Sequence, residues 1–109
     1  MRAVTVSQTG AGSSQIIPLD HFISPFNVGF GVKVSAGASL LYTMQHTFDD
    51  VLAVDYDPAA TTWYDHPSVF DQDINQDGNY AFPVTAIRVT VLSGTGTVTL
   101  TAIQAGSGN

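Results

Sequence analysis

Apolar side chains occupy every second position along much of this chain, which is the pattern of β-strands with one buried face. The clearest case is residues 86–104, where a four-residue turn with two glycines separates two alternating runs. The apolar positions are Ile87, Val89 and Val91 in the first run and Val98, Leu100 and Ala102 in the second. This arrangement predicts an antiparallel hairpin with three apolar pairs on one face, Val91 lying beside Val98.

Two further alternating runs follow one another in the middle of the chain. They are residues 28–34, with Val28, Phe30, Val32 and Val34 on the apolar face, and residues 40–48, with Leu40, Tyr42, Met44, His46 and Phe48 on that face. We expect a second hairpin here, with Val32 beside Tyr42. Gly29 and Gly31 lie on the opposite face and leave bare backbone, which another chain can approach closely.

Shorter segments complete the pattern. Residues 2–8 alternate as a first strand, 15–19 and 61–64 are short strands, and 80–84 lead into the run that begins at residue 86. The total is about seven or eight short strands, with no helical pattern of useful length. The sequence therefore predicts an all-β fold, an antiparallel β-sandwich of jelly-roll-like topology. We expect residues 1–109 to form a single domain, with a flexible tail over about 105–109.

Composition supports this fold class and narrows the partners. The 109 residues include twelve Thr and twelve Val, which favour strands, and all nine acidic residues are Asp, which is a poor helix former. Charged residues make up 11% of the chain, against roughly 25% in a typical soluble domain. A net charge of −6 with only three basic residues argues against binding to nucleic acid or to an anionic membrane surface.

Several features that would change this interpretation are missing from the sequence. There is no cysteine, so no disulfide, thiolate nucleophile or cysteine metal site is expected. The first ten residues contain no apolar run of the kind found in signal peptides. No segment approaches the ~20 apolar residues that a membrane-spanning helix needs.

One acidic segment has the spacing of a calcium loop. Asp73, Asn75 and Asp77 precede Gly78 as in the first half of an EF-hand loop. The twelfth position of that loop is Val84, where a bidentate carboxylate is needed, and no flanking helices are expected. Asp and Gly are also ordinary turn formers. We therefore predict a turn without a bound metal or other cofactor, with a calcium site as the weaker alternative.

No residues stand out as a catalytic group. The three histidines are far apart in the sequence, and His46 alternates in phase with Tyr42 and Met44, which indicates a hydrogen-bonded histidine at the edge of the core. Nothing in the sequence selects a nucleophile–base pair. No carboxylate pair has glycosidase geometry either, because neighbours such as Asp49 and Asp50 point to opposite faces of a strand, and Asp71 and Asp73 lie in an apparent turn. We expect a protein that is not an enzyme.

Aromatic residues gather in the acidic segment 49–79. Trp63 and Tyr64 have three possible roles, namely stacking on sugar rings, capping one end of the core, and anchoring a protein interface, where Trp and Tyr are enriched. Together with the glycine-bearing strand, this segment gives a set of candidate interface residues. They are Gly29, Phe30, Gly31, Tyr56, Trp63, Tyr64, His66 and Phe70.

Five stretches in this order cover nearly the whole chain. They are PFNVGFGV at 25–32, YTMQHTFDD at 42–50, TWYDHP at 62–67, GNYAFPVTAIRVTV at 78–91 and GTGTVTLTAIQAG at 94–106. Taken together, they resemble a family of small virion proteins of tailed bacteriophages. The matching stretches carry no active site, and they leave out the run from Asp73 to Asp77.

The resemblance implies a structural component of the phage particle, first of all a capsid decoration or cement protein that contacts the major capsid protein or another virion protein. A tail, fibre or head–tail joining component is a further possibility. A carbohydrate-binding or receptor-recognition module of a tail or fibre is the main alternative. A protein of charge −6 is repelled by packaged DNA, so we expect it on the outer face of the shell after synthesis in the host cytoplasm. We also expect a homo-oligomer, a dimer or trimer, with contacts through the Gly29–Gly31 face and residues 49–79.

Overall fold

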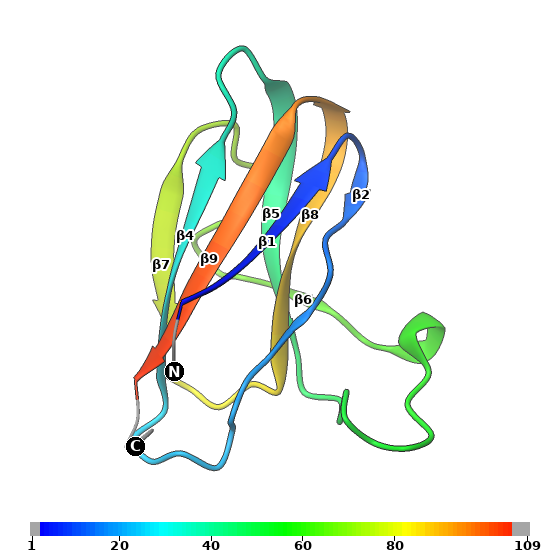
Figure 1. Cartoon of the computed structure of the whole chain (residues 1–109), viewed down its shortest axis with the longest axis vertical. Helices are drawn as coiled ribbons and strands as arrows, with labels where there is room; N and C mark the ends of the chain where they lie inside the picture. Colours follow the sequence, from blue (N-terminus) through cyan, green and yellow to red (C-terminus); the bar gives the residue numbers. More distant parts are fainter. Residues whose placement is uncertain (1–2, 106–109) are drawn as a thin grey trace.

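Two antiparallel β-sheets pack face to face in the computed structural model of this chain, which describes residues 3–105 (Figure 1). The four-stranded sheet contains, in spatial order, β1 (Val4–Thr9), β9 (Thr97–Ala105), β4 (Asn27–Val34) and β7 (Gln76–Tyr80). The five-stranded sheet contains β2 (Gly12–Ser13), β8 (Ala86–Thr95), β5 (Ser39–Thr47) and β6 (Tyr64–Asp65), and β3 (Ile17–Pro18) also pairs with β8. The predicted all-β sandwich is confirmed.

The strand order follows from folding the chain back on itself. In sequence order, the first half pairs with the second: β1 with β9, β2 and β3 with β8, β4 with β7, and β5 with β6. The chain is thus one long antiparallel hairpin whose tip lies between β5 and β6. Rolling this hairpin places β4 beside β9 and β5 beside β8. This is the jelly-roll arrangement, in which β2 and β3 are two pieces of one edge strand.

The long connection at the hairpin tip holds the only helical turn in residues 3–105. This turn is a 3-10 helix, η1 (Pro58–Ala60), capped by the Asp57 side chain. No helix within the described residues is long and apolar enough to cross a membrane.

The core lies between the two sheets and contains the apolar faces that alternation predicts. In β8, Ile87 and Val89 are fully buried while Arg88 between them points to the outer face. The same alternation buries Val98 and Leu100 in β9. The large side chains with less than 2% of their surface exposed are Tyr42, Tyr80, Ile17, Met44, Ile87, Leu100, Val28, Val69, Val84, Val89, Val91 and Val98. Burial of apolar area on this scale is the main stabilising term of the fold.

Both predicted hairpins are wrong, because their strands lie in different sheets. Val91 pairs with Tyr42 in β5, whereas Val98 pairs with Val34 in β4. Likewise, Val32 pairs with Leu100 rather than with Tyr42. Alternation shows which face of a strand is buried. It does not show whether two strands with apolar faces pair within one sheet or pack against each other from two sheets. In this chain they meet across the core.

The remaining strand predictions differ from the structure at their ends. The segment predicted at 2–8 overlaps most of β1, and β3 lies within 15–19. The segment 61–64 shares only Tyr64 with β6, and 80–84 shares only Tyr80 with β7. The segment 73–78 is only partly a turn, because β7 begins at Gln76. Apart from Ala105, which ends β9, the predicted flexible tail lies outside the described residues.

Three short chain crossings between the sheets meet at one end of the sandwich, which we call the crossing end, and the longer crossing 66–75 reaches the same end. The short crossings are residues 10–11, 35–38 and 96, joined by hydrogen bonds from Gly10 N to Gly96 O (2.9 Å) and from Ser35 N to Thr97 O (2.9 Å). Close approach at this end requires glycine. Gly94 has a φ of 100°, and a Cβ there would lie 2.1 Å from the Ser39 carbonyl oxygen.

Replacing Gly94 should therefore be costly. We expect Gly94→Ala to lower the free energy of unfolding by at least about 2 kcal/mol, since it adds both a positive-φ strain and a backbone clash. The matched control is Gly31→Ala, because a Cβ at Gly31 meets nothing within 4 Å. This control should gain up to about 1 kcal/mol from the lower chain entropy of alanine. Equilibrium urea unfolding measures both, and a Gly94→Ala protein as stable as wild type would contradict the prediction.

Candidate functional site

Exposed apolar side chains gather at the end of the sandwich opposite the crossing end. The strand directions bring the connections 19–26, 48–63 and 81–85 to this end, at the bottom of Figure 1, and we call it the loop end. It holds half of the large exposed apolar side chains, with their exposed fractions: Phe22 (85%), Phe48 (53%), Leu52 (75%), Val54 (108%), Tyr64 (49%) and Phe82 (43%). Concentrations of exposed apolar surface mark sites of interaction.

Three of these residues, Phe48, Tyr64 and Phe82, form one aromatic patch around the His46 ring. The centroid of the His46 ring lies 5.6 Å from Phe48, 5.9 Å from Tyr64 and 5.5 Å from Phe82. Phe48 lies 5.6 Å from Tyr64 and 6.4 Å from Phe82. Ring pairs at these separations attract one another beyond their burial alone. The patch is therefore a packed surface of three rings, not a scatter of single side chains.

The aromatic patch rests on buried rings that continue into the core. His46 is 5% exposed, and its Nδ1 shares a 3.0 Å hydrogen bond with the Tyr80 hydroxyl. The Tyr80 ring lies 4.9 Å from His66 and 5.6 Å from Phe30. The predicted hydrogen-bonded histidine at the core edge is confirmed for His46. Because the supporting rings are fixed by packing, the patch keeps its shape without a partner.

His66 holds the chain beneath the patch by three hydrogen bonds. Its Nδ1 accepts from the backbone N–H groups of Ser68 (3.1 Å) and Val69 (3.2 Å). The hydrogen is therefore on Nε2, which donates to the Asn79 carbonyl oxygen at 3.1 Å. This single imidazole connects the 66–69 turn to β7.

The two titratable groups beneath the aromatic patch, His46 and Tyr80, are held in their uncharged forms near neutral pH. Burial and the nearby His66 lower the pKa of His46 from its ordinary value, and Asp65 opposes this only partly. Burial also raises the pKa of the Tyr80 hydroxyl, with a further contribution from Asp65. An uncharged ring surface is suited to contact with a protein.

Trp63 lies elsewhere, on the outer face of the five-stranded sheet. The Arg88 guanidinium carbon lies 4.1 Å from the centroid of the Trp63 ring, a cation–π contact. The Arg88 Nε donates to Gln45 Oε1 at 2.9 Å, and the Gln45 amide donates to Asp65 Oδ1 at 3.0 Å. The core-cap interpretation is therefore wrong for Trp63, because Arg88 projects from β8 away from the core.

The other candidate interface residues are spread over the molecule. Phe30 (5% exposed) and His66 (6%) are buried, so the prediction that their side chains form a surface contact is corrected. Phe30 shares the inward face of β4 with its apolar neighbours, which leaves Gly29 and Gly31 on the outer face. Two candidates, Tyr56 and Phe70, belong neither to the aromatic patch nor to the contact between Trp63 and Arg88. Tyr56 is half-buried and accepts a 2.6 Å hydrogen bond from Thr61, while Phe70 is 45% exposed.

Sequence reasoning missed Phe48 and Phe82 as surface residues. Alternation assigns Phe48 to the buried face of its strand, but β5 ends at Thr47 and the ring turns outward. Phe82 lies in the segment 80–84, to which no surface role was assigned, and it follows the end of β7. An available signal is that each aromatic residue stands directly beside a strand-ending feature: Asp49 follows Phe48 and Pro83 follows Phe82.

The calcium candidates do not converge on one point. Asn75 Oδ1 accepts the backbone N–H of Val34 at 2.8 Å, and Asp77 lies within β7 opposite Gly31. Over residues 3–105 there is no group of three or more His, Cys, Asp or Glu side chains placed to hold a metal ion. The spacing of Asp73, Asn75 and Asp77 thus reflects a strand entry in which the amide side chain bonds to the backbone.

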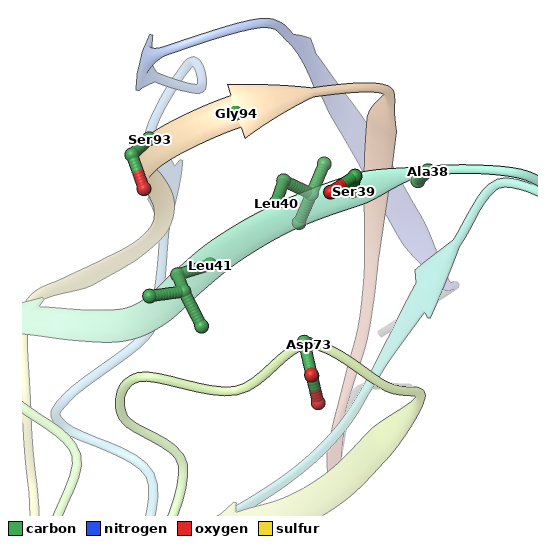
Figure 2. Close-up of a pocket in the computed structure, with 7 residues that line it drawn as sticks. All are labelled: Ala38, Ser39, Leu40, Leu41, Asp73, Ser93 and Gly94. Carbon is green, nitrogen blue, oxygen red and sulfur yellow. The ribbon is translucent and has the colours of Figure 1, made fainter.

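A recess of about 440 Å³ at the crossing end is lined by Asp73 and residues of β5 and β8. Figure 2 shows that the Asp73 carboxylate points away from β5, while the Ser93 hydroxyl lies on the far side of Leu41. The Asp73 carboxylate and the Ser93 hydroxyl therefore do not point toward one another. This recess therefore lacks the convergent polar groups of a ligand site.

The lowered pKa of His46 predicts an acid-sensitive fold. In the unfolded chain this imidazole titrates near its ordinary pKa of 6.5, so acid below that value favours unfolding. The stability due to neutral His46 is present above about pH 6.5 and is lost as the pH falls through the lowered folded-state pKa. We expect the melting temperature to fall between about pH 7 and pH 5, and to fall less steeply in His46→Gln. Equal slopes in wild type and His46→Gln would argue against this assignment.

Known proteins give no further guide to the site. The chain has no significant match among protein-family models, curated proteins or solved structures. What the molecule does must therefore be argued from its own surface, in which the aromatic patch and the loops around it are the most distinctive region.

Proposed function

We propose that this chain is a structural protein of a tailed-bacteriophage virion, a decoration or cement protein that binds the outer face of the head and stabilises it. The observation that carries the proposal is the aromatic patch of Phe48, Tyr64 and Phe82. Aromatic residues are the commonest anchors of protein interfaces, and a patch fixed before binding loses little entropy when it docks. The resemblance of the sequence to small virion proteins supports the same function.

The charge distribution favours the outside of the shell over its interior. The sequence contains nine Asp residues and only three basic residues. Arg88, one of the two basic residues in the described part of the chain, already contacts Trp63 and Gln45. Little positive charge is left to neutralise phosphates, so contact with packaged DNA is unfavourable.

The outer face of the four-stranded sheet suits the homo-oligomer that we include in the proposal. Hydroxyl groups pair across β1 and β9 at 3.1 Å for Thr5–Thr101, 3.1 Å for Ser7–Thr99 and 2.9 Å for Thr9–Thr97. On β4, Gly29 and Gly31 leave the adjoining backbone without side chains. Because these hydroxyls already bond to each other, a second flat surface can cover the face without leaving many polar groups unpaired.

The proposal predicts that substitutions in the aromatic patch weaken binding to the head. We expect Phe48→Ser and Phe82→Ser each to reduce the affinity for phage heads assembled without this chain by at least about tenfold, since an interface anchor is lost. Their melting temperatures should stay near wild type, because both rings are about half exposed. The control is Leu92→Ser, which removes a side chain of similar exposure (49%) from β8 toward the crossing end. Co-sedimentation with heads measures the affinities, and wild-type binding by both patch variants would refute the role of the patch.

A carbohydrate-binding or receptor-recognition module of a tail or fibre is the second candidate. The observation that favours it is the half-buried Trp63 ring beside Arg88, Gln45 and Asp65, which supplies a stacking surface and polar groups together. This function predicts saturable, micromolar quenching of Trp63 fluorescence by sugars on a glycan panel, lost in Arg88→Met. Head binding without any sugar response favours the decoration protein.

A further inference from the structure

Two of the three most exposed large apolar residues in the described part of the chain project from the connection between β5 and β6. Leu52 is 75% exposed and Val54 is 108% exposed, as open to solvent as in an unfolded chain. We call these two side chains the apolar tip. They belong to the sequence DDVLAVDYD at 49–57, an apolar run of four residues with Asp on both sides. A free surface of this kind is unfavourable in water unless a partner covers it.

The connection holds the apolar tip in a defined shape without a partner. Two successive turns close through hydrogen bonds from Ala53 N to Asp50 O (3.2 Å) and from Tyr56 N to Ala53 O (3.1 Å). The Asp50 carboxylate also accepts from Leu52 N at 3.1 Å. At its base, the connection is closed by a 3.0 Å hydrogen bond from Thr62 N to Asp49 Oδ2. A preformed loop gives up less conformational freedom on docking.

The tip is surrounded by charge of a single sign. Asp50, Asp55 and Asp57 are all exposed around it, and the segment 49–57 contains no basic residue. A partner that covers the apolar side chains therefore brings its own rim next to three carboxylates. Complementary charge at such a rim requires Lys or Arg.

We propose that Leu52 and Val54 insert into an apolar groove with a Lys- and Arg-bearing rim on the virion protein that this chain binds, an inference that rests on the proposed function. The contact is reciprocal. Beside Leu52 lies a recess of about 300 Å³. It is lined by Pro18, Leu19, Asp20, His21, Phe22 and Leu52, and it takes an apolar side chain from the partner.

Charge argues against a second copy of this chain as the occupant. Each copy carries a net charge of −6. Of the basic residues in the described part of the chain, Lys33 lies on β4 and Arg88 contacts Trp63, so neither lies in the connection that carries the tip. Docking tip to tip would place like charges together, which is unfavourable. An anionic membrane surface is excluded by the same carboxylates.

The test uses phage heads assembled without this chain and measures co-sedimentation over a range of salt concentrations. The double variant Leu52→Ser/Val54→Ser should bind at least about tenfold more weakly at every salt concentration, because it removes the apolar contact. The double variant Asp50→Asn/Asp55→Asn keeps the turn-forming side-chain oxygens but removes two charges. It should bind more weakly at low salt and depend less steeply on salt than wild type. Leu92→Ser is the control and should bind as wild type.

The remaining outcomes separate this inference from the proposed function. If Leu52→Ser/Val54→Ser binds heads with wild-type affinity while Phe82→Ser binds more weakly, the inference about the apolar tip is wrong and the decoration function is still supported. If the affinity of the wild-type chain for heads does not change with salt concentration, the proposed Lys- and Arg-bearing rim of the groove is wrong. A self-associating chain that becomes monomeric in Leu52→Ser/Val54→Ser on sedimentation would assign the tip to a second copy. Failure of the wild-type chain to bind heads would overturn both proposals.

Discussion

The burial of two apolar sheet faces against each other is the interaction on which the rest of this molecule depends. Every long strand contributes alternate residues to the shared core, and β5 and β8 together supply Tyr42, Met44, Ile87 and Val89. Because the paired strands come from opposite halves of the chain, the core forms only when the whole chain has rolled up. The short crossings at one end bring the backbones close together, which is why Gly94 is needed there. The tip of the rolled hairpin lies at the other end, where the connections are long.

The core also determines how rigid the candidate site is. Phe30, Tyr80 and His66 form a ring cluster within the sandwich, and His46 joins this cluster to the exposed rings of Phe48 and Phe82. The aromatic patch is therefore the outer surface of the core at a place where no strand covers it. The same arrangement makes the patch sensitive to acid, since protonation of His46 puts a charge among buried rings.

The sequence predicted the long strands β4, β5, β8 and β9 and their buried faces well, because a period of two is imposed by strand geometry. The short strands β6 and β7 were located poorly. The sequence did not predict which strands are neighbours, since Val91 matches Val98 in a hairpin as well as across a core. Surface residues were the hardest to predict. Phe48 and Phe82 face outward only because their strands end one or two residues earlier, and strand ends depend on pairing with distant parts of the chain. Trp63 lies on Arg88, a residue 25 positions away, a contact that no local pattern reports.

The size of the loop end limits what it can bind. The molecule measures 39 × 28 × 22 Å, and the loops lie at one end of its long axis (Figure 1). The rectangle that encloses the cross-section is about 600 Å², smaller than the ~800 Å² of accessible surface that each partner buries in a standard interface. Under the proposed function, a single partner would cover both the aromatic patch and the apolar tip, and the hydroxyl-bearing face of the four-stranded sheet would stay free. The two proposed contacts, with a shell through the loop end and with a second copy through the sheet face, are therefore compatible, because they use different surfaces.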